Sequence, residues 1–141
     1  MAARSPSRNA QPRRTVLYVD DDAGAIRTAR AVIAQRELAL VVASDLERAL
    51  NLARRKPPEV MLVNLDLVAL GAASLVHILR ANPATHAAPI LALGVHAAPE
   101  ASIKALEAGI FHYLVRPLDA GHLTEALDYA LEFSALERAE L

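Results

Sequence analysis

Residues whose types bear on chemistry stand at four points where an apolar run of the sequence ends. They are Asp20-Asp21-Asp22, Asn64 with Asp66, Gly94, and Arg116 before Pro117. Carboxylate oxygens bind hard dications such as Mg²⁺ and can take a group in covalent transfer. Ligands of an open α/β sheet lie beyond the carboxyl ends of its strands. The pattern therefore predicts one polar site shared by several strand ends.

The elements that must position this site alternate in type along the chain. Apolar, often β-branched runs predict strands at 15–19, 38–43, 59–64, 89–93 and 111–115. Apolar residues at helical spacing predict helices at about 23–35, 46–55, 72–81, 99–108 and from 119 through 133 or beyond. This order predicts an α/β fold with a parallel sheet covered by helices on both faces.

Local signals predict how several of these elements begin and end. Asp22 is a candidate N-cap, and Ser44 with Glu47 has the pattern of a capping box. Gly109 suits a left-handed helix end, and residues 65–71 are predicted to form a loop.

Composition limits the class of protein. The chain has 141 residues, a net charge of −1 and no Cys, which predicts one domain without disulfides or thiolate metal sites. The near-neutral charge argues against nucleic acid or a membrane as partner, and no apolar run is long enough to span a bilayer. A cytoplasmic location is expected. Residues 1–14 contain four Arg and no acidic residue, so a disordered basic tail is expected, either a solvated leader or a tether.

Several stretches together resemble a response-regulator receiver domain of two-component signalling, as found in hybrid sensor kinases. They are LYVDDD at 17–22, PEVMLVN at 58–64, NPAT at 82–85, and ALEAG at 105–109 leading into YLVRP at 113–117. The resemblance covers about 15–133, with 134–141 extending the last helix. It implies a three-layer (βα)5 flavodoxin-like fold with strand order 2-1-3-4-5.

The resemblance also assigns roles to the polar residues. In this family an Asp ending the third strand accepts a phosphoryl group, and it binds Mg²⁺ together with an acidic pair, here Asp20 and Asp21. The family's switch aromatic is matched by Tyr113. The phosphoacceptor, the hydroxyl and the Lys positions instead hold Asn64, Gly94 and Arg116.

These departures change the expected chemistry. An amide oxygen forms no stable acyl phosphate, so Asn64 removes the acceptor, while Gly94 removes a hydroxyl and Arg116 replaces a compact ammonium by a broad fork. We expect an atypical receiver that is not an enzyme and requires no cofactor, with Asp20 and Asp21 binding Mg²⁺ weakly at most. The amide of Asn64 is expected to donate to Asp20 or Asp21.

Other interpretations stay open at this point. Asp66 is either an exposed carboxylate or a displaced acceptor with residual Mg²⁺ binding. Tyr113 either switches or simply packs. The five His residues have no metal-site spacing. A flavodoxin-like ligand binder or a hydrolase using 20–22 is disfavoured, because no loop is built to cradle phosphate.

The expected function is phosphorylation-independent binding to a sensor kinase, scaffold or output protein. The expected surface is the last helix-strand-helix face, formed by 98–109, 111–115 and 119–133, which could also form a homodimer. A last helix that runs past the core exposes Phe133 and Leu136, and these side chains need a cover.

Overall fold

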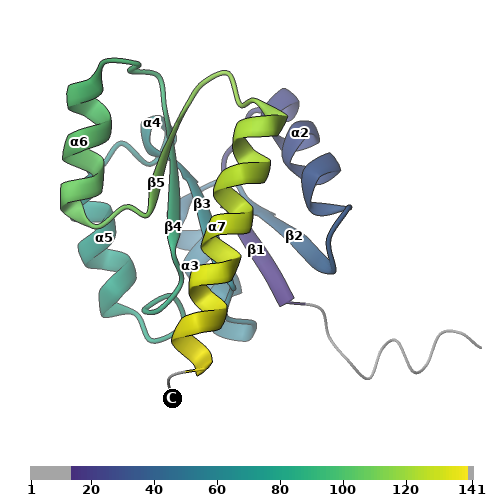
Figure 1. Cartoon of the computed structure of the whole chain (residues 1–141). Helices are drawn as coiled ribbons and strands as arrows, with labels where there is room; N and C mark the ends of the chain where they lie inside the picture. Colours follow the sequence, from purple (N-terminus) through teal and green to yellow (C-terminus); the bar gives the residue numbers. More distant parts are fainter. Residues whose placement is uncertain (1–13, 140–141) are drawn as a thin grey trace, which may run out of the picture.

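The computed structural model describes residues 14–139, and its strands and helices alternate along the chain (Figure 1). The elements are β1 (Arg14–Val19), α2 (Ala23–Ile33), β2 (Leu38–Ala43), α3 (Leu46–Arg55), β3 (Val60–Asn64), α4 (Leu65–Val68), α5 (Ala72–Ala81), β4 (Ile90–Gly94), α6 (Pro99–Ala108), β5 (His112–Val115) and α7 (Ala120–Ala139). No helix in this part of the chain is long and apolar enough to cross a membrane.

The five strands form one parallel sheet in the order β2-β1-β3-β4-β5, which confirms the predicted fold and strand order. Every residue of β3 and β4 is buried. Continuous apolar runs are the sequences expected for parallel strands that are covered on both faces.

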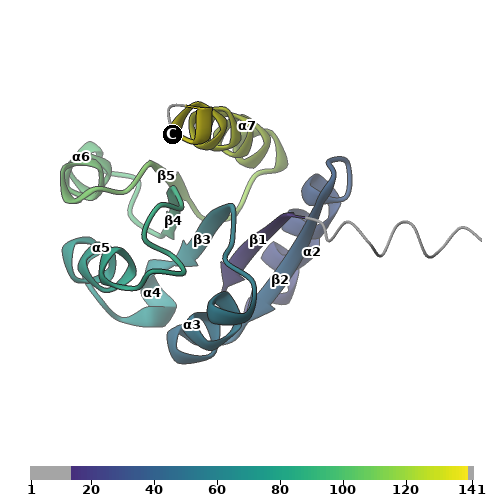
Figure 2. The same cartoon turned by 90° about the horizontal axis from the view of Figure 1, so that it is seen from below.

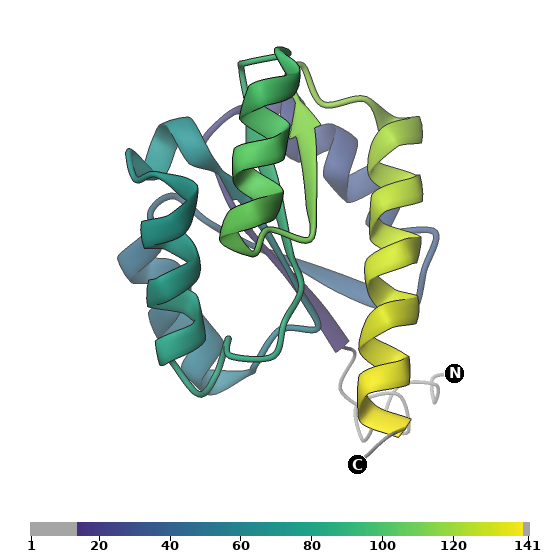
Figure 3. The same ribbon diagram turned by 60° about the vertical axis from the view of Figure 1, so that its left-hand side comes forward.

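Two hydrophobic layers cover the sheet. One contains the inward residues of α2 and α7, and the other contains those of α3, α5 and α6. The view along the sheet in Figure 2 shows α2 and α7 on one side and α3, α5 and α6 on the other. Figure 3 shows α6 and α7 flanking β5, which is an edge strand.

Strand register brings the polar residues together. Val19 pairs with Val63 in the parallel β1–β3 ladder, so Asp20 and Asn64 follow at neighbouring strand ends. Asn64 pairs with Leu93, and Gly94 pairs with Val115 just before Arg116. The four strand ends singled out in the sequence therefore lie together at the carboxyl edge of the sheet.

Three local expectations need correction. Residues 65–68 form the short helix α4 instead of loop, because the side chain of Asn64 caps their N–H groups. The N-cap of α3 is Asp45 and not Ser44, since the Asp45 carboxylate accepts from the N–H of Arg48 at 2.8 Å. Arg14, expected in the tail, belongs to β1. The predicted tail at 1–13 otherwise lies outside the described residues.

The other end signals behave as expected. Asp22 caps α2 through its side chain. Gly109 ends α6 with a φ of 111°, a conformation that favours glycine. α7 continues well past Phe133, as the sequence indicated.

Candidate site at the carboxyl edge of the sheet

Asp20 is the centre of the site and is almost fully buried, with 1% of its surface exposed. Its Oδ1 accepts from the backbone N–H of Asp21 at 2.7 Å, from the N–H of Asp22 at 3.2 Å, and from the Asn64 amide at 2.9 Å. Its Oδ2 accepts from the hydroxyl of Tyr18 at 2.5 Å. A buried carboxylate is tolerated when hydrogen bonds from the protein replace those from water, and here both oxygens of Asp20 accept such bonds.

Asn64 is also buried and uses both ends of its amide. The Nδ2 group donates to Asp20, as the sequence predicted. The Oδ1 atom accepts from the N–H of Asp66 at 2.9 Å and from that of Leu67 at 3.3 Å, which caps α4. An aspartate at this position would lack the donor that Asp20 receives.

Tyr18 belongs to the site, although its place in the apolar run 15–19 predicted only a buried strand residue. Residues two apart in a strand point to the same face, so Tyr18 and Asp20 could have been paired from that spacing. Burial, and then the hydrogen bond to Asp20, raise the pKa of Tyr18 far above its usual range. Tyr18 therefore stays a neutral donor to the carboxylate.

Arg116 and Asp22 close a second side of the site. Arg116 Nη2 donates to Asp22 Oδ2 at 2.7 Å, and both side chains are partly exposed. The other Asp22 oxygen accepts from the N–H groups of Gly24 and Ala25 at the start of α2. The peptide bond from Arg116 to Pro117 is cis. The ion pair with Asp22 holds the Arg116 guanidinium beside the N-cap of α2.

Tyr113 occupies the space that a side chain at position 94 would need. A Cβ added to Gly94 would lie 3.0 Å from Cε1 and Cζ of Tyr113 and closer still to its hydroxyl oxygen. That hydroxyl donates to the carbonyl of His96 at 3.0 Å. Burial raises the pKa of Tyr113. Tyr113 can therefore take this position only because residue 94 has no side chain.

Asp21 and Asp66 lie at the rim of the site, and both are exposed. Each contributes a backbone N–H to the buried pair, Asp21 to Asp20 and Asp66 to Asn64. The buried hydrogen-bonded network does not include either of their carboxylates.

The family's Mg²⁺ can be tested against these residues. A hard dication needs several oxygen ligands with available lone pairs. The carboxylate of Asp20 is already engaged by four donors, and the oxygen of Asn64 is turned toward α4. Within residues 14–139, no three His, Cys, Asp or Glu side chains are grouped to hold a metal ion. In this arrangement the residues do not fit a Mg²⁺ site.

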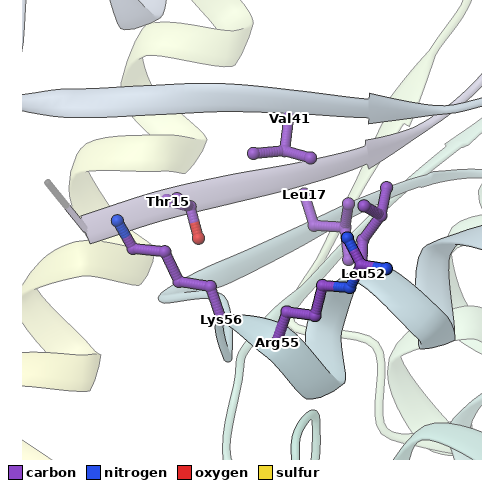
Figure 4. Close-up of a pocket in the computed structure, with 6 residues that line it drawn as sticks. All are labelled: Thr15, Leu17, Val41, Leu52, Arg55 and Lys56. Carbon is purple, nitrogen blue, oxygen red and sulfur yellow. The ribbon is translucent and has the colours of Figure 1, made fainter. Parts of the chain in front are cut away.

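A separate hollow lies toward the amino end of β1, away from the polar edge. It is lined by Thr15, Leu17, Val41, Leu52, Arg55 and Lys56 and has a volume of about 130 Å³ (Figure 4). Its walls come from β1, β2, α3 and the residue that follows α3, and three of the six lining side chains are apolar. None of its lining residues takes part in the hydrogen bonds around Asp20.

Known proteins resemble this chain in both sequence and fold. The family model described as response regulator receiver domain matches residues 16–128. The transcriptional regulatory protein ZraR of Salmonella typhimurium is 32% identical over 127 residues, which cover 89% of this chain and 28% of ZraR. The chain therefore spans little more than a quarter of that relative.

Solved structures agree with this family. A putative response regulator from Chloroflexus aurantiacus is 26% identical, with a TM-score of 0.73 over 86% of this chain and 99% of its own. The receiver domain of a putative LuxO repressor protein from Vibrio parahaemolyticus has a TM-score of 0.78 at 16% identity, over 91% and 97% of the two chains, and shows the shared fold. The chain belongs to the response regulator receiver domain family of two-component signalling.

Proposed function

We propose that this receiver domain acts by binding other proteins and accepts no phosphoryl group at Asn64. The observation that carries the proposal is the hydrogen bond from Asn64 Nδ2 to the buried Asp20 carboxylate, at 2.9 Å. That bond occupies the position where the family has its acceptor oxygen. The amide is fixed at its other end by the N–H groups of α4, so turning it would remove one donor from Asp20 and the acceptor that caps α4.

The neighbouring groups support the same conclusion. Arg116 is paired with Asp22, and Tyr113 fills the space beside Gly94. A phosphoryl group on β3 would need a cation and donors free to reach its oxygens. Both groups that could approach already have partners inside the protein.

The surface distribution of apolar residues supports an interaction role. Within the part of the chain that the structure describes, every exposed large hydrophobic side chain lies on α6, β5, α7 or the loop before α6. They are Val95, Ile103, Leu106, Val115, Tyr129, Phe133 and Leu136. These residues gather around the β5 edge of the sheet, and such a concentration of exposed apolar residues is typical of a protein-binding surface. Apart from Val95 and Leu136, they lie within the segments 98–109, 111–115 and 119–133 that the sequence predicts as the interaction surface. Its candidate partners are kinases, scaffolds, output domains and a second copy.

The phosphotransfer part is tested with acetyl phosphate and Mg²⁺, followed by intact mass measurement. We expect no phosphoryl adduct on the wild-type chain. The Asn64→Asp variant serves as the matched sample, because it restores a carboxylate at the same strand end. A stoichiometric adduct on the wild-type chain would contradict the proposal.

A second candidate function uses Asp66 as a displaced acceptor. Its carboxylate is exposed, two residues past Asn64, and after burial its charge also acts to raise the pKa of Tyr113. If the wild-type chain gains an adduct that Asp66→Asn abolishes, this second function replaces the first. An adduct that survives Asp66→Asn would point to another acceptor.

A further inference from the structure

An aromatic patch on α7 lacks a cover in the described part of the chain. The patch consists of Phe111, Tyr129, Phe133 and Leu136. Tyr129 is 65% exposed, Phe133 42% and Leu136 63%, and with Phe111 and Glu132 they line a hollow of about 390 Å³. Phe111 packs against Tyr129 edge to face at 6.3 Å and against Phe133 at 5.3 Å between ring centroids. The ring cluster is therefore a preformed apolar surface.

The spacing of the patch matches a helical partner. Tyr129, Phe133 and Leu136 lie four and three residues apart, so they form one stripe along α7. The adjacent side of α7 is already covered, because Leu123, Leu127 and Ala130 are buried in the core. A second helix laid along the stripe would insert its apolar side chains into the hollow.

The charged side chains around the stripe favour a partner of opposite charge. The exposed charged side chains described on α7 are all acidic, namely Glu125, Asp128, Glu132 and Glu137, and Asp128 is already paired with Arg36. Glu132 lines the hollow itself. The patch also lies on the carboxyl-terminal half of the helix, where the macrodipole is negative. A second copy would bring the same acidic residues to the contact, whereas a basic helix would be attracted.

We propose that the α7 aromatic patch binds an amphipathic helix from another protein that carries Lys or Arg beside its apolar stripe. This inference rests on the proposed interaction role and names the chemistry of the partner. Lys and Arg would pair with Glu132 and lie over the faces of Tyr129 and Phe133, which attract cations.

The test uses the full chain and two synthetic helical peptides of about 18 residues, long enough to be helical by themselves. Both peptides carry the same Leu stripe, flanked by Lys in one and by Glu in the other. Fluorescence anisotropy should show that the Lys peptide binds at least about tenfold more tightly, with the difference shrinking as salt is raised. Glu132→Lys should reverse the preference, whereas Glu47→Lys on α3 should not. Phe133→Ser should weaken binding of either peptide.

Equal binding of the two peptides, or no binding of either, would overturn the inference. A dimer seen by light scattering that excludes the Lys peptide would assign the patch to a second copy and would also overturn it. A phosphoryl adduct on the wild-type chain would refute the proposed function but would leave the peptide result unchanged, so the two failures are distinguishable.

Discussion

The carboxyl-edge site and the α7 aromatic patch differ in whether their side chains have partners inside the protein. At the site, both oxygens of the buried Asp20 accept hydrogen bonds, and the Asn64 amide is used at both ends. On α7, Tyr129 and Leu136 remain about two thirds exposed. A group whose interactions are already satisfied has little to gain from a ligand, whereas an exposed apolar surface gains by being covered. The contrast supports the proposal that a partner binds at α7 and not at the family's usual chemical centre.

The largest effect is expected from Asn64→Asp, which converts the satisfied site into a repulsive one. The change removes a donor to Asp20 and places two carboxylates in contact, which should lower the free energy of unfolding by about 2–4 kcal/mol at pH 7. The repulsion raises a folded-state carboxylate pKa above its unfolded value. Part of the stability should therefore return as the pH falls through that raised pKa.

Urea unfolding at several pH values measures this loss and its recovery. The matched control is Asn51→Asp, which makes the same change at an exposed position of α3. If the two variants were equally stable, the Asn64–Asp20 hydrogen bond would contribute nothing to stability. The carboxyl-edge site could then not be called satisfied in contrast to the α7 aromatic patch.

The next effect is expected from Tyr18→Phe. The variant keeps the buried ring but leaves Asp20 Oδ2 without its described donor, which should cost about 1–3 kcal/mol. The folded-state pKa of Tyr18 is raised, so its contribution is complete below the usual Tyr pKa of about 10 and is lost as the pH rises above it.

Chemical unfolding between neutral and alkaline pH checks both parts of this prediction. The wild-type chain should lose stability above about pH 10 more steeply than Tyr18→Phe does. Parallel curves for the two proteins would show that Tyr18 is not the protected donor.

The sequence predicted the frame of the site better than its internal contacts. Alternating apolar runs and helical spacings specify the sheet, and the strand ends then bring Asp20 and Asn64 together. The Asn64–Asp20 hydrogen bond was expected because amide and carboxylate are complementary. These features depend on signals that lie close together in the chain or on the order of its elements.

The missed features depend on side chains that meet only in the folded protein. Gly94 was interpreted as a lost hydroxyl, but Tyr113 fills the vacated space. The pairing of Arg116 with Asp22 joins residues 94 positions apart. The helix α4 was missed because only the donor end of the Asn64 amide was expected to have a partner, whereas its oxygen accepts from the N–H groups of Asp66 and Leu67 and caps the helix.

A smaller effect is expected from Gly94→Thr. The new side chain should push Tyr113 outward and break its hydrogen bond to His96, at a cost of about 0.5–1.5 kcal/mol. Because burial raises the pKa of Tyr113, its outward movement should lower that pKa toward the ordinary value. Ultraviolet titration of the phenolate detects this shift, and a Gly94→Thr, Tyr113→Phe double variant identifies which tyrosine titrates. An unchanged titration would mean that Tyr113 does not depend on Gly94.

The smallest effect on stability is expected at the α7 aromatic patch. Leu136→Ser should change the free energy of unfolding by less than about 0.5 kcal/mol, because the side chain is mostly exposed. Thermal unfolding measures the change, and Leu127→Ser, at a fully buried position of the same helix, is the destabilising comparison. A large decrease in the free energy of unfolding of Leu136→Ser would show that the patch stabilises the fold, which would contradict its role as a free binding surface.

The most direct measurement is a magnesium titration followed by thermal unfolding of the wild-type chain beside Asn64→Asp. A site whose carboxylate is already satisfied should gain nothing from the cation, so the wild-type Tm should stay constant through millimolar Mg²⁺, while the Tm of the repulsive variant should rise. A large Mg²⁺-dependent rise in the wild-type Tm would contradict the account, because it would show that Asp20 and its neighbours still form a metal site.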